Sequence, residues 1–467
     1  MKKYEQLADE LERQSREGLL EVGEKIPSVR AMSKKKALSI NTVLAAYELL
    51  ERKGLLATKP RSGFYVLSRQ EDRLPRVSQG TNIPIDAKIP DLLGILIDSS
   101  KNRDFVQFGA AYLAPELYPT EHINQLTRQV LREFPHISST YELSPGAFDY
   151  RRQISKLLAD AGCHVPVEEI LATNGGAESI SLALRATCKP GDTVITESPL
   201  FFGTLQAMEG LGLKVLEVRS HPTFGIDIEQ LRKALKKHKV AAAVLMPNFS
   251  NPLGSAMSDS GKKEVAKLLV HHGVPTIEDD IYAELPFQGA RPKPLRAYDD
   301  SGLIITCSSF SKTVSPGLRI GWIAPGRFYK ELRRLQLSTT MASGTLSQKI
   351  IARYVASNSY ERNLKKLRLH CAIQVHKTAQ EVLSHFPDGT RVSLPQGGFV
   401  LWVELPKKID AVELYRKSIA KKISFSPGIL FSATTQYRNF LRLNCGNVWH
   451  PKIKENLRTL GNLAKRY

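Results

Sequence analysis

In the first seventy residues, apolar residues recur at helical spacing, and glycine and proline residues interrupt this pattern. This pattern predicts one helix over 4–20, a second that begins at Ser28 and a third that begins at Ser39. Both serines can act as N-caps, because a hydroxyl accepts from the amides that a helix start leaves free. Two short apolar runs, 55–58 and 64–66, predict strands. We therefore expect three helices followed by a two-stranded β-wing.

From about residue 105 onward, short β-branched runs alternate with helical patterns. Six of these runs predict buried strands, at 170–173, 193–196, 214–218, 242–246, 276–278 and 304–307. Strands separated by helices indicate a mainly parallel sheet of the doubly wound class. Ligands bind such sheets beyond the carboxyl ends of the strands, so we expect the chemistry in the loops that follow.

Residues 69–104 hold no long periodic segment and mix three prolines with polar residues. We interpret them as a partly ordered linker between a module at 1–68 and a large domain at 105–467. Twenty extended residues span roughly 60 Å at most. The N-terminal module could therefore lie over the body of a different protomer.

The composition of the 467-residue chain narrows the function classes. It has no apolar run of membrane-spanning length, and Met1–Gln6 lacks the apolar core of a signal peptide. Five cysteines stand apart with no Cys-x-x-Cys pair, which disfavours a disulfide framework or a zinc site. We therefore expect a cytoplasmic protein with no membrane partner and no metal.

The distribution of charge indicates a polyanionic partner. The formal net charge is +20. Between residues 25 and 69 the chain has ten basic and two acidic residues, and ten minus two leaves a local excess of +8. The predicted first helix is acid-rich instead. A basic block beside an acidic helix is typical of a module with one face turned to phosphates.

One lysine lies in a segment rich in hydroxyls and small residues. Residues 308–321 read Ser-Ser-Phe-Ser-Lys-Thr-Val-Ser-Pro-Gly-Leu-Arg-Ile-Gly. Covalent chemistry at Lys312 needs a neutral amine, and a desolvated pocket near the cation Arg319 lowers a lysine pKa. The planar fork of Arg319 also suits a phosphate, and Ser309 and Ser311 add hydroxyl donors. Taken alone, Ser-x-Ser-Lys also fits an exposed loop.

The whole segment resembles the cofactor lysine segment of fold-type I pyridoxal-phosphate (PLP) enzymes. The resemblance implies that Lys312 forms a Schiff base with PLP and that Ser309, Ser311 and Arg319 bind the cofactor. Four further strand-end segments resemble the same family, at 174–178, 197–203, 247–254 and 278–282. The cofactor-binding residues that they imply are Gly176, Ala177, Phe201, Asn251, Asp279 and Tyr282.

Each of these residues has an implied role. Gly176 and Ala177 begin a helix whose N-terminus favours the phosphate, and Phe201 stacks on the pyridine ring. Asn251 and Tyr282 share the ring hydroxyl, and Asp279 pairs with the pyridine nitrogen. Phe201 also fits an ordinary core position. Asp279 and Asp280 could instead hold a metal, but neighbours at a strand end point apart.

Two segments carry implications for a partner subunit and a ligand. Tyr141 lies in Tyr-Glu-Leu-Ser-Pro-Gly, which resembles the segment whose tyrosine reaches the phosphate of the partner's cofactor. This resemblance implies a head-to-tail homodimer with shared sites. Arg442 lies in Phe-Leu-Arg-Leu-Asn, which resembles the segment that grips a substrate α-carboxylate bidentately.

The N-terminal module resembles the winged helix of GntR-type repressors. The matching residues are Ile26–Arg30, Ser39, Asn41–Val43, Tyr47, Leu50, Gly54–Leu55 and Gly63. The resemblance implies double-stranded DNA as a partner. It places Arg30, Ser39, Asn41 and Thr42 at the major groove or its phosphates, and Lys59, Arg61 and Gly63 at the backbone or minor groove. A small helical protein-interaction domain remains the alternative.

Taken together, the chain is similar to the MocR/GabR-type regulators over nearly all its residues. The implied fold is α/β: a fold-type I aminotransferase-like, mainly parallel sheet with a smaller C-terminal α+β subdomain, preceded by a winged helix-turn-helix. The implied function is a PLP-dependent DNA-binding transcriptional regulator that senses a small amino compound or PLP itself. A catalytically active aminotransferase with an appended DNA-binding module stays open, and so does a purely structural cofactor pocket.

Overall fold

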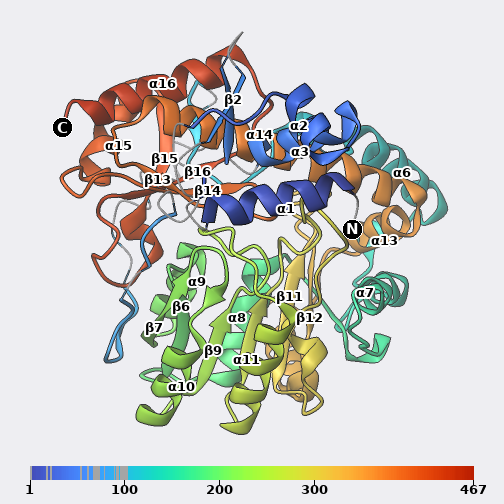
Figure 1. The fold of residues 1–467 in the computed structure, drawn as a ribbon. Coiled ribbons are helices and arrows are strands. Elements are labelled where there is room, and N and C mark those ends of the chain that lie inside the picture. Colours follow the sequence, from blue (N-terminus) through green and yellow to red (C-terminus); the bar gives the residue numbers. More distant parts are fainter. Residues whose placement is uncertain are drawn as a thin grey trace.

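The computed structural model (Figure 1) describes most of the chain. The described residues are 3–16, 19–20, 24–52, 55–59, 63–66, 74–77, 79–88, 90, 94, 102 and 104–467.

The N-terminal module has the predicted elements. Its elements are α1 (Lys3–Arg16), α2 (Val29–Lys36), α3 (Ile40–Arg52), β1 (Leu56–Lys59) and β2 (Gly63–Val66). The side chain of Ser28 caps α2 by accepting from the Ala31 amide at 3.2 Å, and that of Ser39 caps α3 by accepting from the Thr42 amide at 3.1 Å. β1 and β2 pair antiparallel. The predicted three helices, two caps and β-wing are confirmed.

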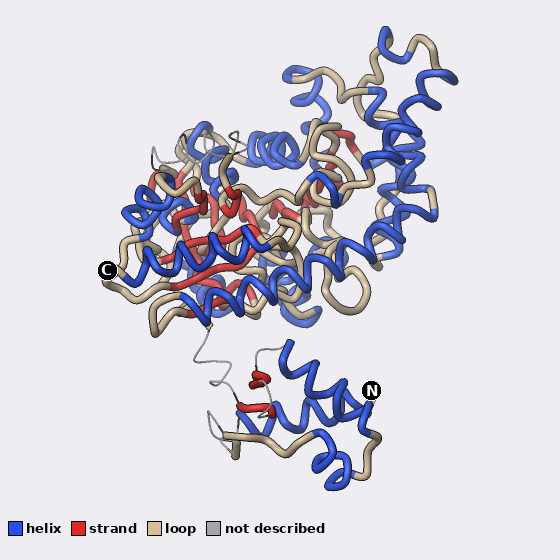
Figure 2. Tube along the Cα trace, turned by 90° about the horizontal axis from the view of Figure 1, so that it is seen from above, coloured by secondary structure: helices blue, strands red, loops and turns tan. Residues whose placement is uncertain are grey.

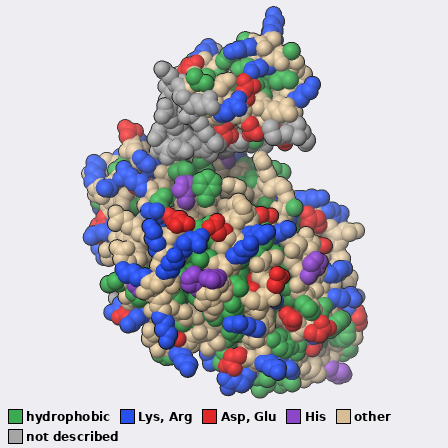
Figure 3. Space-filling view, turned by 60° about the horizontal axis from the view of Figure 1, so that its bottom comes forward, with side chains coloured by type: hydrophobic (Ala, Val, Ile, Leu, Met, Phe, Trp, Pro, Cys, Tyr) green, Lys and Arg blue, Asp and Glu red, His purple; other side chains and the backbone are tan. Residues whose placement is uncertain are grey.

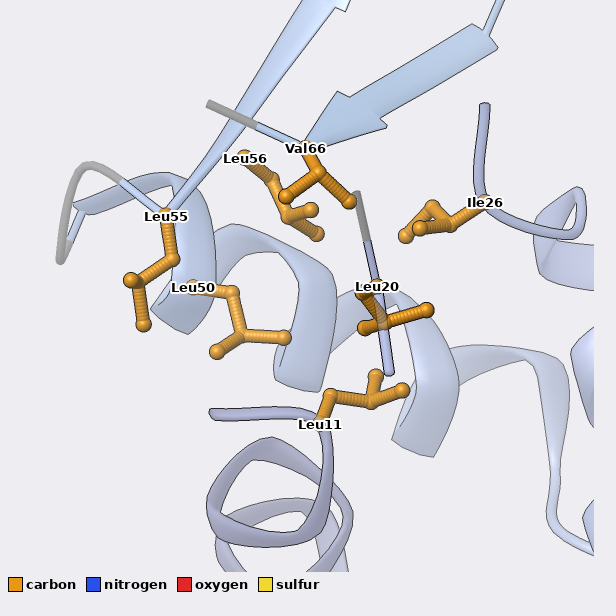
Figure 4. A pocket seen from close by; sticks show the side chains of 7 residues that line it. All are labelled: Leu11, Leu20, Ile26, Leu50, Leu55, Leu56 and Val66. Atoms are coloured by element: carbon orange, nitrogen blue, oxygen red, sulfur yellow. The ribbon is translucent and has the colours of Figure 1, made fainter. Parts of the chain in front are cut away.

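The module has a hydrophobic core of its own, built from α1, α2, α3 and both wing strands. Figure 4 shows seven side chains of this core around a small cavity of about 10 Å³: Leu11, Leu20, Ile26, Leu50, Leu55, Leu56 and Val66. Because the lining is wholly apolar and the space so small, this cavity is a packing gap and not a ligand site. Figure 2 shows the module as a unit apart from the larger body.

The described part of the predicted linker is attached to the body at several points. The Arg76 amide donates to Glu404 Oε2 at 2.7 Å, and the Glu217 amide donates to Thr81 Oγ1 at 2.8 Å. Residues Ile85–Asp86 form strand β3, which pairs antiparallel with β7 (Lys214–His221). This segment is therefore part of the folded body along much of its described length.

The body is built on a nine-stranded sheet with the order β3-β7-β6-β9-β10-β11-β12-β5, in which β8 pairs with β7 (Figure 1). The strands not yet given are β5 (Leu171–Thr173), β6 (Thr193–Ser198), β8 (Gly225–Ile226), β9 (Ala242–Leu245), β10 (Thr276–Asp279), β11 (Ile304–Ser309) and β12 (Gly321–Ala324). β7, β6, β9, β10 and β11 are parallel neighbours, and β12 is antiparallel to both β11 and β5. β5 therefore runs with the parallel set. The six predicted strands and the mainly parallel sheet are confirmed.

Helices cover both faces of this sheet. α8 (Gly176–Thr187), α9 (Phe202–Gly210) and α12 (Tyr329–Thr339) contribute to the core on one face. α10 (Ile228–Lys237) and α11 (Asp259–His271) contribute to the core on the other. Neighbours on one strand divide between the two cores, as Val194 and Ile195 do, because successive side chains alternate in direction. The doubly wound class is confirmed.

A second, five-stranded sheet has the order β13-β14-β16-β15-β4. Its strands are β13 (Arg391–Val392), β14 (Val400–Glu404), β15 (Ile423–Pro427), β16 (Phe440–Asn444) and β4 (Val106–Phe108). Side chains of α14 (Asn358–His385), α15 (Ala411–Ile419) and α16 (Pro451–Lys465) share its core. The predicted C-terminal α+β subdomain is confirmed. Its parallel edge strand β4, however, comes from the start of the body.

Three further helices complete the body: α6 (Thr120–Glu133), α7 (Phe148–Asp160) and α13 (Thr345–Ala356), which pack together over β5 and β12. Among the described residues, none of the helices combines the length and the apolar character needed to cross a membrane.

Candidate cofactor site and nucleic-acid interface

Lys312 lies in the turn that follows β11, beyond the carboxyl end of the strand. Its Nζ donates to the Ala111 carbonyl at 2.5 Å. Burial lowers the pKa of Lys312 to about 8, and the cations Arg442 and Arg319 act in the same direction against the opposing pull of Asp279. An amine with this pKa is neutral far more often at neutral pH than an ordinary lysine, so Lys312 is suited to nucleophilic chemistry.

Asp279 ends β10, the strand next to β11, and is buried. Burial raises the pKa of its carboxyl group to about 7, although the Ile281 amide donates to Oδ1 at 3.2 Å and lowers it. The nearby Lys312 also lowers this pKa, but among the described residues no cation forms an ion pair with the carboxyl group. A cationic ring nitrogen placed against it would favour the carboxylate and would in turn keep its own proton.

Asp280 points away from Asp279, as expected for neighbours at a strand end. Its Oδ1 accepts from Asn248 Nδ2 at 2.8 Å, and its Oδ2 pairs with Arg291 Nη2 at 2.6 Å. Arg291 Nε also pairs with Glu284 Oε1 at 2.8 Å. Asp280 is thus committed to a buried ion-pair network that holds the turn after β10.

The N-terminus of α8 forms a cradle for an anion. Gly175 precedes the helix with a φ of 99°, and no side chain caps the free amides at Gly176 and Ala177. Arg319 Nη2 donates to the Asn174 carbonyl at 3.2 Å, beside this turn. A Cβ at Gly175 would lie 2.7 Å from Arg319 Nη2, so only glycine allows the guanidinium this approach.

Hydroxyl groups complete the cradle. Ser309 Oγ lies 3.8 Å from the position that a Cβ would take at Gly176, and it accepts from the Ser311 amide at 3.3 Å. Free helix amides, a guanidinium and a serine hydroxyl are the donors that a phosphate monoester requires. The structure therefore brings Lys312, Gly176, Ala177, Ser309, Ser311 and Arg319 together around the end of β11.

Arg442 is fully buried on β16 of the small sheet. Its Nη2 donates to the Gly109 carbonyl and to Ser426 Oγ, and its Nη1 donates to Asn251 Oδ1 at 3.3 Å. Its Nε has no hydrogen-bond partner among the described residues. Burial lowers the pKa of Arg442 to about 10. A buried guanidinium that faces no carboxylate among these contacts favours an anionic ligand.

Two ring-contacting candidates lie beside Arg442. Asn251 is buried, and its peptide bond to Pro252 is cis. Tyr282 is buried with its ring edge against Phe399, at 5.2 Å between ring centroids. Burial raises the pKa of the Tyr282 hydroxyl, while Arg442 lowers it. Both residues therefore lie on the side of the site where the two sheets meet.

Phe201 and Tyr141 are not joined to this cluster by the contacts described above. Phe201 is half-buried at the start of α9, with its ring 4.7 Å from that of Phe202 and close over Gly203. Tyr141 is 79% exposed. An exposed tyrosine agrees with a role toward a partner subunit and not within its own chain.

Sequence reasoning missed one wall of the site, formed by the segment from Gly109 to Tyr118. The carbonyls of Gly109 and Ala111 accept from Arg442 and Lys312, and the Tyr118 hydroxyl donates to the Ser311 carbonyl at 3.3 Å. Backbone carbonyls leave no trace in a sequence. The aromatic Tyr118 before Pro119 was the only available signal, and it also fits an ordinary turn.

In the N-terminal module, Arg30 and Asn41 are exposed on α2 and α3. The hydroxyls of Ser39 and Thr42 lie 2.8 Å apart, so both are engaged at the start of α3. Gly63 begins β2 with a φ of 113°. The side chain of Lys59 and all of Arg61 lie outside the described residues. Figure 3 shows Lys and Arg side chains over the visible faces of both module and body.

Comparisons with known proteins agree with both parts of this structure. Residues 119–460 match the aminotransferase class I and II family, and residues 3–66 match the gntR family of bacterial regulatory proteins. Two HTH-type transcriptional regulators of Escherichia coli (strain K12), YjiR and YdcR, are 34% and 35% identical; each alignment covers 100% of this chain and 99% of the relative.

A solved structure supports the assignment of the body. The α-aminoadipate aminotransferase LysN from Thermus thermophilus, complexed with N-(5'-phosphopyridoxyl)-L-leucine, has a TM-score of 0.74 and 26% identity. The alignment covers 81% of this chain and 95% of LysN. The body therefore has the fold-type I aminotransferase fold predicted from the sequence.

Fold and site together define a body with the fold of the PLP-dependent aminotransferase class I and II family, joined to a winged-helix module of the gntR family. The chain belongs to the family of MocR-like HTH-type transcriptional regulators, in which a GntR domain is fused to an aminotransferase class I and II domain. The anion cradle at α8, the amine of Lys312 and the buried carboxyl group of Asp279 fit the family cofactor. When bound, PLP supplies an aldehyde for amines and an electron-withdrawing ring.

Proposed function

We propose that this regulator uses its cofactor site to sense an amino compound that carries a carboxylate, or PLP itself, and transmits occupancy of the site to DNA binding. The observation that carries this proposal is the lowered pKa of Lys312 together with the buried Asp279 and Arg442, in the same chain as a winged helix. Lys312 provides the amine that holds the cofactor, and a ligand amine competes with it. A ligand shifts the protein only by its different affinities for the two states.

The remaining candidates have complementary roles in this proposal. Gly176, Ala177, Ser309, Ser311 and Arg319 bind the phosphate. Asp279 holds the proton of the ring nitrogen, Asn251 and Tyr282 bind the ring hydroxyl, and Phe201 covers the ring. Arg442 binds the ligand carboxylate. Arg30, Ser39, Asn41 and Thr42 approach the major groove, and Lys59, Arg61 and Gly63 approach the DNA backbone.

A second candidate function is catalytic transamination. It is supported by the lowered pKa of Lys312, about 8, because an amine that exists in both protonation states near physiological pH can also transfer protons. Transamination would add turnover to the same binding site, without changing the residues that hold the cofactor.

An absorption experiment tests the two functions together. The cofactor-loaded protein is mixed with a panel of amino compounds, and its visible spectrum and its affinity for promoter DNA are followed over time. For a sensor, one compound shifts the spectrum to a stable new state and changes DNA affinity in parallel. Continued conversion to the aminated cofactor, reversed by a keto acid, with no change in DNA affinity, would contradict the sensor role.

Arg442→Ala is expected to weaken carboxylate-bearing ligands selectively. Charge-assisted hydrogen bonds contribute about 1.5–3 kcal/mol, so we expect a loss of roughly 10- to 150-fold for amino acids. The decarboxylated amine of the same skeleton is the matched ligand and should lose little. Spectral titrations of both ligands with both proteins measure the difference. Equal losses for acid and amine would instead give Arg442 a structural role in joining β4 to β16.

The rate at which PLP attaches to the empty protein should depend on pH through Lys312. Its pKa is lowered to about 8. Below that pH the protonated amine predominates, so the rate should rise about tenfold per pH unit, and above it the rate should level off. Stopped-flow absorbance gives the profile. A rise that continues to pH 10 would mean that Lys312 titrates as an ordinary exposed lysine.

We also propose that the protein acts as a head-to-tail homodimer. Tyr141, Leu143, Phe148 and Met341 are exposed although they are large and apolar, and Leu143 and Ala342 pair as an isolated β-bridge. A second copy that covers this surface would bring Tyr141 to the phosphate of its partner's cofactor. We place the protein in the cytoplasm, where its DNA target lies and where its five cysteines stay reduced.

A further inference from the structure

The outward face of α3 carries two large apolar side chains. Ile40 is 51% exposed and Leu44 is 39% exposed, and Asn41 between them is also exposed. Residues four apart lie one above the other on a helix. Ile40 and Leu44 therefore form one continuous apolar spot on the first turns of α3, next to the amide group of Asn41.

This exposure is unusual within the module. Of the other apolar residues of α3, Val43, Ala46, Tyr47, Leu49 and Leu50 are buried in the core of the module. Among the described residues of the module, Leu19, Ile40 and Leu44 are the exposed large hydrophobics. Because Ile40 and Leu44 lie outside the core, the packing of the module does not explain why these two positions are apolar.

The surroundings of the spot indicate its ligand. Arg30, Lys34 and Lys35 are exposed on α2, the helix that packs against α3. The hydroxyl of Thr42 is engaged with Ser39 at 2.8 Å, which leaves Asn41 as the polar side chain beside the apolar pair. An apolar spot on one helix with exposed cations on the adjacent helix matches the major groove of B-DNA, where phosphates line the edges and the thymine methyl is the apolar group on the floor.

We propose that Ile40 and Leu44 read thymine by contact with its 5-methyl group, and that α3 thereby specifies A·T pairs at adjacent positions of the operator. This inference rests on the proposed DNA-binding function. Four residues of helix rise about 6 Å, which is less than two base-pair steps. The two side chains therefore select thymines in neighbouring base pairs. Asn41 would contact a base edge or phosphate next to them.

The first experiment uses the full-length, cofactor-loaded protein and no variant. Bound duplexes are selected from a random double-stranded DNA library, and the preferred duplex is resynthesised with each thymine in turn replaced by uracil, which lacks the methyl group. At one or two neighbouring positions the dissociation constant should rise about fourfold, as expected for loss of one buried methyl. Other thymines should tolerate the change.

The second experiment combines each uracil duplex with Ile40→Ala and Leu44→Ala. If a side chain contacts the methyl, its removal abolishes the penalty for uracil at that position, because the two changes remove the same contact. Ile83→Ala is the matched control, since Ile83 is 63% exposed and lies outside the module. This control should keep the full uracil penalty.

The outcomes separate the inference from the proposed function. If the wild-type protein enriches no sequence, the DNA-binding function itself fails. If it enriches a sequence but tolerates uracil everywhere, or if both α3 variants keep the penalty, DNA binding stands and methyl reading is overturned. If Ile40→Ala instead disrupts self-association and leaves the penalty intact, the spot is a protein contact and the inference is also overturned.

Discussion

Lys312→Ala is expected to abolish covalent attachment of PLP and, with it, the response of DNA binding to amino compounds. Lys312 supplies the amine that holds the cofactor, and its only hydrogen bond given above is to the Ala111 carbonyl. Loss of one such bond costs about 1 kcal/mol, so the variant should fold. The visible band of the lysine-linked cofactor should disappear completely, and DNA affinity should no longer change with ligand.

The control for this result is Lys330→Ala. Lys330 is exposed on α12, so this variant makes the same substitution away from the site. It should keep both the visible band and the ligand response. Mass spectrometry of the borohydride-reduced protein locates the cofactor on its peptide. A reduced cofactor found on another lysine of the wild-type protein would contradict the assignment of Lys312.

Asp280→Ala is expected to lower the free energy of unfolding of the body by about 3 kcal/mol or more, since it leaves the largely buried Arg291 without one of its two carboxylates. The ion pair between Asp280 Oδ2 and Arg291 Nη2 measures 2.6 Å, and Asn248 donates to the other oxygen. The same network fixes the turn after Asp279. Urea unfolding of the full-length protein, in which the transition of the body is followed, measures the change in the free energy of unfolding.

A double-mutant cycle makes this prediction specific. Arg291→Ala should also destabilise the body, but Asp280→Ala with Arg291→Ala should cost less than the sum, because neither charge then remains buried alone. Asp300→Ala is the matched control, since Asp300 is exposed, and it should change stability by less than about 0.5 kcal/mol. If the double variant loses as much stability as the two single variants together, the Asp280–Arg291 interaction makes no contribution of its own to the stability of the body.

The strand pattern predicted the strand ends at which two of the candidate site residues lie, while the resemblance implied their roles. Asp279 ends β10 and Lys312 follows β11, and these strands are parallel neighbours. Local pattern therefore placed both on the same edge of the sheet before any contact was known. The caps at Ser28 and Ser39 were predicted for the same reason, because an N-cap is a local interaction.

Contacts between distant segments were not predictable in this way. Arg442 binds Asn251, which is 191 positions away, and Gly109, which is 333 positions away. The strand β4 joins β15 through backbone hydrogen bonds that any residues could make. The resemblance predicted that Arg442 would meet a ligand, but not that it also joins both ends of the body.

The segment from residue 74 to 87 gives the body a mechanical property. Leu74 and Arg76 are fastened to β13 and β14 of the small sheet, whereas Thr81 and Ile85 are fastened to β7 of the large sheet. The five residue-to-residue steps from Arg76 to Thr81 reach about 17 Å when fully extended. When the segment from Arg76 to Thr81 is fully extended, any further separation of the two sheets would place it under tension. In sequence, the winged helix precedes the N-terminal end of this segment.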